Sequence, residues 1–478
     1  MHHPKDDRHP EIVRCSSSLV NCSVHSGAWC GQEPDVPPDV KLCLIVSAQE
    51  LAAERDQGNP SSVRSSLVDN GGNELRNKLL LAAVFSVYFA FRSGCLIVLP
   101  LASRDLLRHE VHNKFSPIYQ VPLCTWFVMD IIITAPNAWF MKTYGRRRGF
   151  MLGNSFAMAA STGAFLVLSY LPGWPVLAFA LLNLTVMFMS VIGMAEFVRF
   201  AAAECCVDPA HSSAAVSQVL TGGAMFSMVG PFSASLGQML APGDDPLDHV
   251  QGFAYFFLLM GVFACVGFMS AYMLRLPVPN EVVRTETTPL MKIFRRPAVV
   301  RAVCAQTSVQ FAMVLPMSAV PLTMGHRLHL SEASLIISGV VMVHIACMFL
   351  PGLISGKLIA KIGIFPVMLS GLLLQAAAML TGLLLDGVHS FYIYLSLLGV
   401  GWNLAFVAGT VLLLDSHSLH DRPRVTSANE ALRFFGNACA VLISSSVSWP
   451  NVSYICLGFV TLCAVALMTS RCCRYSEG

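Results

Sequence analysis

The chain has 478 residues, of which 55% are apolar and only 12% are charged, with a mean hydropathy of +0.61. So few charges cannot cover the surface of a soluble protein of this length, and a net charge of +3 gives no reason to expect a nucleic-acid partner. The sixteen cysteines show no Cys/His spacing typical of zinc, so we expect no metal, cofactor or disulfide framework. The composition predicts an integral membrane protein.

The two ends of the chain differ from the rest. Residues 1–77 are rich in Pro, Ser, Asp and Gly, and their only apolar stretch, Leu42 to Val46, is far shorter than the roughly 20 residues that span a bilayer. We expect a disordered cytosolic tail there, with a metal site at Cys15, Cys22, Cys30 and Cys43 as a minor alternative. Residues 471–478 form a second cytosolic tail. Its Cys472 and Cys473 fit an acylation site and two ordinary membrane-edge cysteines equally well.

From residue 78 onward, apolar stretches of roughly 20 to 25 residues alternate with short polar segments. The first six predicted spans are Leu79 to Leu101, Ile118 to Met141, Phe150 to Leu171, Val176 to Ala202, Ala215 to Leu240 and Phe253 to Leu274. The second six are Val299 to Leu322, Ala333 to Ile359, Phe365 to Leu385, Tyr392 to Leu414, Thr426 to Val447 and Ser453 to Met468. The sequence predicts an all-α integral membrane protein with about 12 transmembrane helices. A cytosolic linker, residues 276–297, joins two pseudo-symmetric six-helix halves, residues 78–275 and 298–470.

The distribution of Lys and Arg in short loops predicts the orientation. One side of the membrane has most of them, and the opposite side has little beyond Arg104, Arg108, Lys114 and Arg327. The richer side carries Arg76, Lys78, Lys142, Arg146, Arg147, Arg148, Arg284, Lys292, Arg295, Arg296, Lys357, Lys361, Arg422, Arg424, Arg471 and Arg474. We therefore expect a multi-pass protein with both termini in the cytosol. The membrane expected is the plasma membrane.

Two polar loops lie at equivalent places in the two halves. The loop after the second span is AWFMKTYGRRRGF, and the loop after the eighth is GKLIAKIGIF; superposing Gly145 on Gly363 aligns them. Farther along, the fourth span ends at Glu204 and the tenth at Asp415. Two six-helix halves related in this way are typical of transporter folds, which bind their solute near midplane between the halves.

These loops resemble the signature G-x-L-x-D-R-x-G-R-R of the major facilitator superfamily, matched here by Gly145, Arg146 and Arg147. Ala138 replaces the first glycine, and Lys142 stands where the family has an acidic residue. The second-half copy keeps Gly356, Leu358, Lys361 and Gly363. The stretches VRFAAAE, VSQVLTGGAMFSMVGP, HIACMFLPGLISGKLIAKIG and LGVGWNLAFVAGT further resemble a sparsely characterised bacterial subgroup. The resemblance covers roughly residues 76 to 470 and implies the fold rather than the substrate.

The resemblance also implies a cytosolic gate, in which Arg146 and Arg147 would meet Glu204. Asp415 with Lys361 or Lys357 would be its second-half counterpart. A carboxylate at a membrane edge gains from bidentate bonds to Arg, which supports this assignment, although the same arginines could contact only lipid phosphates. For Lys142 we expect a different acidic partner, Glu430 in the eleventh span.

Several polar residues fall at one depth near the middle of the spans. At 1.5 Å per residue, Arg92 and Asp130 lie at matching distances from the cytosolic edge. Buried charges in a bilayer are costly, so the pair is interpreted as a structural ion bridge, a substrate clamp or a proton-coupled switch. The same depth holds three further candidates for substrate or proton coupling: Gln310, His344 and Asn403. Arg92 with His344 would suit an anionic or amphipathic organic solute.

Two i,i+3 pairs, Glu196 with Arg199 and Glu430 with Arg433, are interpreted as local charge neutralisation on one helix face. The fifth span is rich in glycine, with Gly222, Gly223, Gly230, Pro231 and Gly237, and it resembles a degraded antiporter signature of the superfamily. The same glycines would equally serve to let helices approach closely.

The function predicted is transport of a small organic solute by alternating access, with proton coupling as one version and a facilitative uniporter as another. The partners expected are the solute and the bilayer, and the protein is expected to act as a monomer. The sequence contains no nucleophile with a base, HExxH or Cys/His set, so an enzyme is not predicted. A transport-inactive receptor or scaffold on the same fold is the alternative from another class.

Overall fold

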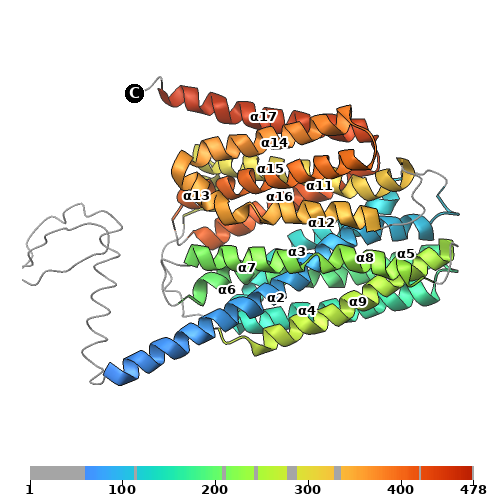
Figure 1. Cartoon of the computed structure of the whole chain (residues 1–478), viewed down its shortest axis with the longest axis horizontal. Helices are drawn as coiled ribbons and strands as arrows, with labels where there is room; N and C mark the ends of the chain where they lie inside the picture. Colours follow the sequence, from blue (N-terminus) through green and yellow to red (C-terminus); the bar gives the residue numbers. More distant parts are fainter. Residues whose placement is uncertain are drawn as a thin grey trace, which may run out of the picture. The chain divides into compact units, whose positions relative to one another are not determined.

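The computed structural model describes residues 60–111, 116–206, 212–241, 246–276, 288–327, 335–418 and 421–475. Within these ranges the secondary structure is helical and contains no strand. Residues Asp69–Gly478 form one compact unit, whose helices are coloured from blue to red in Figure 1. The predicted cysteine site in residues 1–59 lies outside the described residues, as do the side chains of Cys472 and Cys473.

The helices of the first half follow the predicted spans. They are α2 (Pro60–Leu106), η1 (Pro117–Gln120) with α3 (Val121–Tyr144), α4 (Arg146–Tyr170), α5 (Pro175–Met189) with η2 (Ser190–Phe197) and α6 (Val198–Glu204), α7 (Ser212–Phe226) with α8 (Val229–Met239), and α9 (Pro246–Met273). The fourth and fifth spans are therefore interrupted helices. The fourth contains a 3-10 segment at η2, which places Glu196 and Arg199 next to a change in helix geometry.

The second half begins after the short helix α10 (Leu290–Phe294). It consists of α11 (Pro297–Arg327), α12 (Leu335–Phe349) with α13 (Gly352–Ile362), α14 (Ile364–Leu384), α15 (Val388–Asp415), α16 (Arg422–Ser444) and α17 (Trp449–Tyr475). Pro351 separates α12 from α13, as expected of a residue that cannot donate the helix hydrogen bond.

Eleven helices of the described residues are long and apolar enough to cross a membrane. They match eleven of the twelve predicted spans. The remaining one is α16, which has 23 residues but carries Asn429, Glu430 and Arg433 in its interior. This helix packs against α11 of its own half and α3 of the other half, so its polar side chains face protein rather than lipid.

The first span begins earlier than predicted. Helix α2 starts at Pro60, inside the segment 1–77 that was expected to be a disordered tail. The Asn77 side chain donates to the Arg275 carbonyl oxygen at 2.7 Å, beyond the end of α9, and Lys78 pairs with Glu74 at 2.5 Å. The prediction is therefore wrong for the residues just before 78, because these polar contacts extend the helix beyond its apolar part.

The two predicted repeat loops have the same backbone conformation. Gly145 ends α3 and begins α4 with φ 88° and ψ 153°, and Gly363 ends α13 and begins α14 with φ 91° and ψ 164°. Both φ values lie in the left-handed region that favours glycine. The alignment of Gly145 with Gly363 from sequence is thus matched in three dimensions. The end of the bundle that carries these turns is called the Gly145 end below.

Glycines of the fifth span allow close helix packing. A Cβ at Gly230 would lie 2.1 Å from the Ala90 carbonyl oxygen of α2, and a Cβ at Gly223 would lie 2.6 Å from the Ala82 carbonyl oxygen. Any larger residue would force α7 and α8 away from α2. This geometry supports the interpretation that these glycines serve helix packing.

The two halves meet along a few helices. Helix α3 packs against α16, α8 and α7 pack against α12, and α7 packs against α13. At the end opposite Gly145, Ser235 donates to Ser338 at 2.6 Å and the Gln120 amide donates to the Ser318 carbonyl oxygen at 3.0 Å. These bonds connect the halves beside a cavity that opens between them.

Candidate functional site

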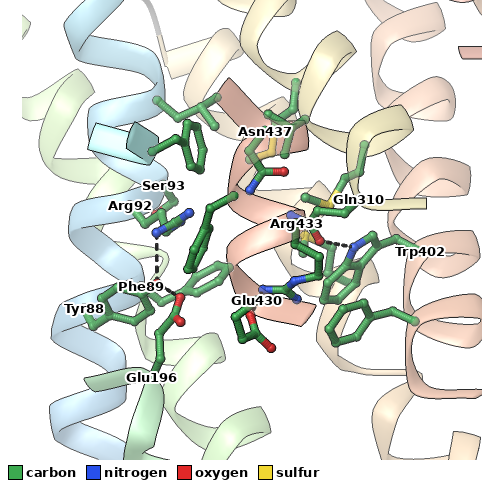
Figure 2. A pocket seen from close by; sticks show the side chains of 18 of the residues that line it. Tyr88, Phe89, Arg92, Ser93, Glu196, Gln310, Trp402, Glu430, Arg433 and Asn437 are labelled. Atoms are coloured by element: carbon green, nitrogen blue, oxygen red, sulfur yellow. Dashed lines mark hydrogen bonds and ion pairs between the residues drawn. The ribbon is translucent and has the colours of Figure 1, made fainter. Parts of the chain in front are cut away.

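A cavity of about 180 Å³ lies between the two halves, and Figure 2 shows its interior. Its lining combines many aromatic side chains with a few charged ones and three methionines. The lining residues are Phe85, Tyr88, Phe89, Arg92, Ser93, Leu96, Leu123, Trp126, Phe127, Glu196, Arg199, Leu220, Gln310, Met313, Val314, Met317, Met348, Phe349, Trp402, Phe406, Glu430, Arg433, Phe434 and Asn437. A mostly apolar cavity with a few converging polar groups is what ligand sites in proteins look like.

The predicted pair of Arg92 and Asp130 forms on the first-half side of the cavity. The Arg92 guanidinium, on α2, donates to the Asp130 carboxylate, on α3, at 2.6 Å. Asp130 is 3% exposed and Arg92 is 16% exposed, so the bond is largely shielded from water. The guanidinium also lies 4.6 Å from the Phe127 ring centre and 5.2 Å from that of Phe434, a residue of the other half. Arg92 therefore lines the cavity with its charge already compensated.

Tyr88 and Glu196 form a second contact next to this pair. The Tyr88 hydroxyl donates to the Glu196 carboxylate and accepts a bond of 3.0 Å from Arg92. Glu196 belongs to the 3-10 segment η2 of the fourth span. The predicted neutralisation of Glu196 by Arg199 is not among the bonds of the described residues. Instead, Arg92 and Tyr88 link Glu196 to Asp130 in one polar chain, of which Figure 2 shows the part from Arg92 through Tyr88 to Glu196.

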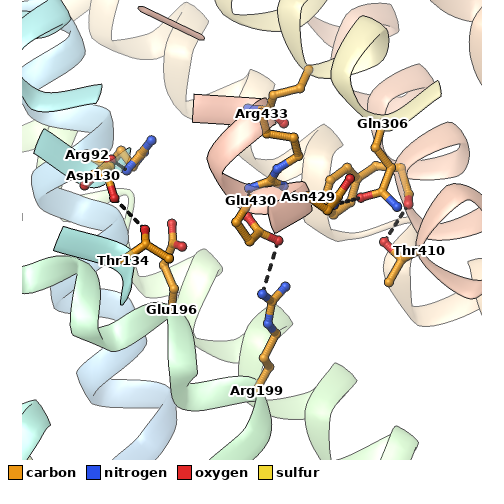
Figure 3. Close-up of polar contacts among 12 residues, drawn as sticks. Arg92, Asp130, Thr134, Glu196, Arg199, Gln306, Thr410, Asn429, Glu430 and Arg433 are labelled. Carbon is orange, nitrogen blue, oxygen red and sulfur yellow. Dashed lines mark hydrogen bonds and ion pairs between the residues drawn. The ribbon is translucent and has the colours of Figure 1, made fainter. Parts of the chain in front are cut away.

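An ion pair connects the two halves across the cavity (Figure 3). The Arg199 guanidinium, on α6, donates to the Glu430 carboxylate, on α16, at 3.2 Å. The other carboxylate oxygen of Glu430 accepts a bond from Arg433, which confirms the predicted local pair on α16. Glu430 thus neutralises one arginine of its own helix and bridges to one of the opposite half.

The second-half side of the cavity is built from aromatic and amide side chains. The Trp402 indole donates to the Gln310 amide oxygen at 2.8 Å, which fixes both side chains. Trp402 and Phe406 stack with ring centres 4.6 Å apart and planes 11° apart, and Arg433 lies 4.9 Å from the Phe406 ring centre. Gln310 is therefore a lining residue, and its NH₂ group lies beside a flat aromatic wall.

His344 and Asn403 lie away from the cavity, contrary to the prediction that they share the solute site. The His344 Nδ1 atom is bonded to the Leu395 carbonyl oxygen at 2.7 Å. The Asn403 amide donates to the Met348 carbonyl oxygen at 2.6 Å and accepts from Ser355 at 2.5 Å. Both side chains join α15 to its neighbours, so they share the depth of the site but point in another direction.

The Arg146 to Glu204 contact predicted by resemblance is present. Arg146 donates to Glu204 through two nitrogens, with Nε at 2.6 Å from one carboxylate oxygen. Arg147 does not join this pair, and its guanidinium lies 5.1 Å from the Tyr272 ring centre. The Arg146 to Glu204 pair joins α4 to α6 within the first half, with Glu204 45% exposed. It therefore stabilises one half at the Gly145 end rather than connecting the two.

The second-half counterpart does not form. Among the described residues, Asp415 makes no ion pair with Lys361 or Lys357, and all three are exposed. Arg296 takes this position instead, donating to the Ser416 carbonyl oxygen at 3.0 Å directly after α15. Gly356 is also exposed, and a Cβ there would meet no atom within 4 Å, so no close packing demands a glycine.

The predicted pairing of Lys142 with Glu430 is wrong. Lys142 is exposed at the end of α3, whereas Glu430 is buried in the cavity wall with Arg199 and Arg433. Lys142, which replaces the acidic residue of the family signature, is therefore not paired with the acidic residue that the sequence suggested. Apart from Arg92, whose depth in the first span was the signal, the charges that line the cavity were indicated in the sequence by the Glu196 to Arg199 and Glu430 to Arg433 spacings.

Asn437 is a lining residue that the sequence analysis missed. It lies on α16 and is 1% exposed, and neither polar atom of its amide has a hydrogen-bond partner among the described residues. An unpaired buried polar group costs about 1–3 kcal/mol, so such a residue calls for a partner.

No group of three or more His, Cys, Asp or Glu able to hold a metal ion occurs in the described part of the chain.

The chain matches the profile of the Major Facilitator Superfamily over residues 80–440. The chain belongs to this superfamily. It is 29% identical over 344 residues, 70% of this chain and 82% of the relative, to the riboflavin transporter RfnT of Brucella anthropi. It is also 33% identical over 141 residues, 29% of this chain and 31% of the relative, to the uncharacterised MFS-type transporter YddS of Bacillus subtilis.

Solved structures of the superfamily share the fold. A D-xylose-proton symporter matches with a TM-score of 0.65 at 15% identity, covering 83% of this chain and 97% of the symporter. The xylose transporter XylE of E. coli, in a partially occluded inward-open conformation, matches with a TM-score of 0.62 at 13% identity, covering 83% and 99%. The membership predicted from the signature loops is confirmed, and so is the all-α membrane fold.

Proposed function

We propose that the protein is a secondary transporter that carries a small, uncharged, flat heteroaromatic solute across its membrane by alternating access. The observation that carries this proposal is the cavity between the halves, which combines aromatic walls with converging polar groups. Aromatic faces bind flat rings with little loss of conformational freedom, and polar groups fix their orientation.

The charges around the cavity support an uncharged solute. Arg92, Arg199 and Arg433 are matched by three carboxylates, those of Asp130, Glu196 and Glu430. Each guanidinium is already bonded to a carboxylate, so an anionic solute would have to displace a carboxylate that stays behind in the protein. This argument replaces the anionic solute expected from Arg92 with His344, because His344 does not line the cavity.

The relative named as a riboflavin transporter supplies the first solute to test. Riboflavin has a flat tricyclic ring with amide-like edges and a polyhydroxyl chain, and it carries no phosphate. Its flat ring with polar edges matches a cavity that has aromatic walls and a few polar groups. We infer a riboflavin-like compound as the solute class.

The contacts between the halves support alternating access. Ser235 with Ser338 and Gln120 with Ser318 hold the halves together at one end, and Arg199 with Glu430 bridges them toward the Gly145 end. Transport would require the two sets to break in turn while the solute stays between them. From the distribution of Lys and Arg, we assign the Gly145 end and both termini to the cytosol. The plasma membrane is the membrane that we propose.

Asp130 is the group through which we propose that a proton gradient acts. Its carboxylate holds Arg92 in the cavity wall, and protonation would remove the charge that holds it. Release of Arg92 would then change both the cavity and its contact with Phe434 of the other half.

The test is uptake of radiolabelled riboflavin into proteoliposomes containing the purified protein, with and without an imposed pH gradient. We expect saturable uptake of the label. Unlabelled riboflavin should inhibit this uptake and riboflavin 5′-phosphate should not, and the uptake should be faster when the outside is acidic. Uptake equal to that of protein-free liposomes would contradict the proposed function. Binding of riboflavin without uptake would support the receptor alternative. An uptake rate that is the same with and without the pH gradient would support a uniporter.

A further inference from the structure

Asn437 stands out among the residues around the cavity because its amide is buried without a partner. Most other polar side chains of the lining have identified bonds, such as Gln310 with Trp402 and Glu196 with Tyr88. The Trp126 Nε1 atom also has no hydrogen-bond partner among the described residues, but it can only donate, whereas the Asn437 amide lacks both a donor and an acceptor partner. Asn437 is 1% exposed, and both its nitrogen and its oxygen lack a hydrogen-bond partner among the described residues. The side chain lines the cavity, and Figure 2 shows it in the wall next to the cavity.

The position of Asn437 on α16 relates it to the charged residues. Arg433 lies four residues earlier, so the two side chains share a face of the helix. Arg433 is engaged with Glu430 and lies over the rings of Phe406 and Phe434. The charge of Arg433 is thus neutralised, and Asn437 is the uncharged side chain on this helix face that can both donate and accept a hydrogen bond.

An amide side chain offers one acceptor oxygen and two N–H donors in a single plane. A ligand satisfies both ends at once when it presents a carbonyl next to an N–H on the rim of a flat ring. A carboxylate or phosphate would leave the amide oxygen without a donor, and a hydrocarbon edge would leave both atoms unpaired. The unpaired amide therefore favours one kind of ring edge.

We propose that Asn437 forms a two-point hydrogen bond with an amide-type edge, an adjacent C=O and N–H, of the transported heterocycle. The NH₂ group of Gln310, whose oxygen is held by Trp402, is a second donor toward the same ring. This inference rests on the proposed function and adds to it the ring edge by which the solute is selected.

The experiment compares two probes by isothermal titration calorimetry with the full-length protein in detergent. One probe is riboflavin, and the other is its derivative methylated on the ring N–H that lies between two carbonyl groups. The variant is Asn437→Leu, which keeps the side-chain size and removes both polar atoms. The control is Asn183→Leu in α5, whose amide is bonded to Phe179 and Thr125 and does not line the cavity.

We expect the wild-type protein and Asn183→Leu to bind riboflavin about 10-fold more tightly than the methylated derivative. Asn437→Leu should lose this preference while remaining folded, because it replaces an unpaired buried amide with an apolar group. A preference that persists in Asn437→Leu would mean that the methyl group is excluded by shape, and this would overturn the inference alone. Failure of the wild-type protein to bind riboflavin would overturn both the inference and the proposed solute class.

Discussion

The two halves of the protein share a backbone but differ in how they use charge. The first half places Arg92 with Asp130 beside the cavity and Arg146 with Glu204 at the Gly145 end. The second half lines the cavity with the Gln310 to Trp402 bond and stacked aromatic rings. Its charged helix, α16, packs against α3 of the first half. The repeat has thus kept the fold of each half, while the charged side chains that line the cavity lie on the first half or on α16, which packs against it.

The largest expected effect follows removal of the ion pair between Arg92 and Asp130 in the first half. Asp130→Asn should reduce riboflavin uptake by about 100-fold or more, because breaking a buried ion pair leaves an uncompensated charge worth about 3–5 kcal/mol. Initial uptake rates in proteoliposomes measure this effect. Thr134→Val is the control, since among the described residues that hydroxyl donates to the Asp130 backbone oxygen and to no side chain. Normal, gradient-driven uptake by Asp130→Asn would show that this pair has no part in transport.

The bridge between the halves should control charge selectivity. Glu430→Gln removes the carboxylate that Arg199 and Arg433 share, so the cavity would gain a net positive charge. We expect riboflavin uptake to fall by about 10-fold and riboflavin 5′-phosphate to become an effective competitor. Competition assays measure both effects, with Glu204→Gln as a control outside the cavity. If the phosphate competes equally well in the wild-type protein, charge balance does not select the solute.

The two repeat turns should respond alike. Gly145→Ala and Gly363→Ala each place a Cβ on a backbone with φ near 90°, which should cost about 1–3 kcal/mol in either half. Thermal unfolding in detergent, followed by tryptophan fluorescence, would show similar decreases in melting temperature. Gly356→Ala is the control: the space there is open and the residue lies inside α13, where alanine favours the helix over glycine, so the melting temperature should stay the same or rise. Unequal decreases at the two turns would contradict their structural equivalence.

The smallest expected effect is a difference in coupling energy between the two predicted gate pairs, Arg146 with Glu204 and Lys361 with Asp415. A double-mutant cycle of Arg146→Gln and Glu204→Gln should give a coupling of about 0.2–1 kcal/mol, because the pair is partly exposed. The same cycle with Lys361→Gln and Asp415→Asn should give a coupling near zero. Melting temperatures of the four variants of each cycle are the measurement. Equal coupling in the two halves would mean that the second gate forms in another conformation.

The sequence alone determined the features that depend on distance along the chain. Span length and polarity predicted the helices, and the loop pattern predicted the equivalence of Gly145 and Gly363. The rise of a helix placed Arg92 and Asp130 at one depth. The resemblance to the superfamily supplied the Arg146 to Glu204 pair, because that contact depends on a motif at fixed places in the fold.

Only the tertiary structure decided which side chains face the cavity. Depth along a helix follows from residue number, but direction around its axis depends on how neighbouring helices pack. His344 and Asn403 therefore share the depth of Gln310 and yet bond to neighbouring helices. The same packing turned Glu430 toward Arg199 rather than Lys142, and it left the amide of Asn437 unpaired beside the cavity.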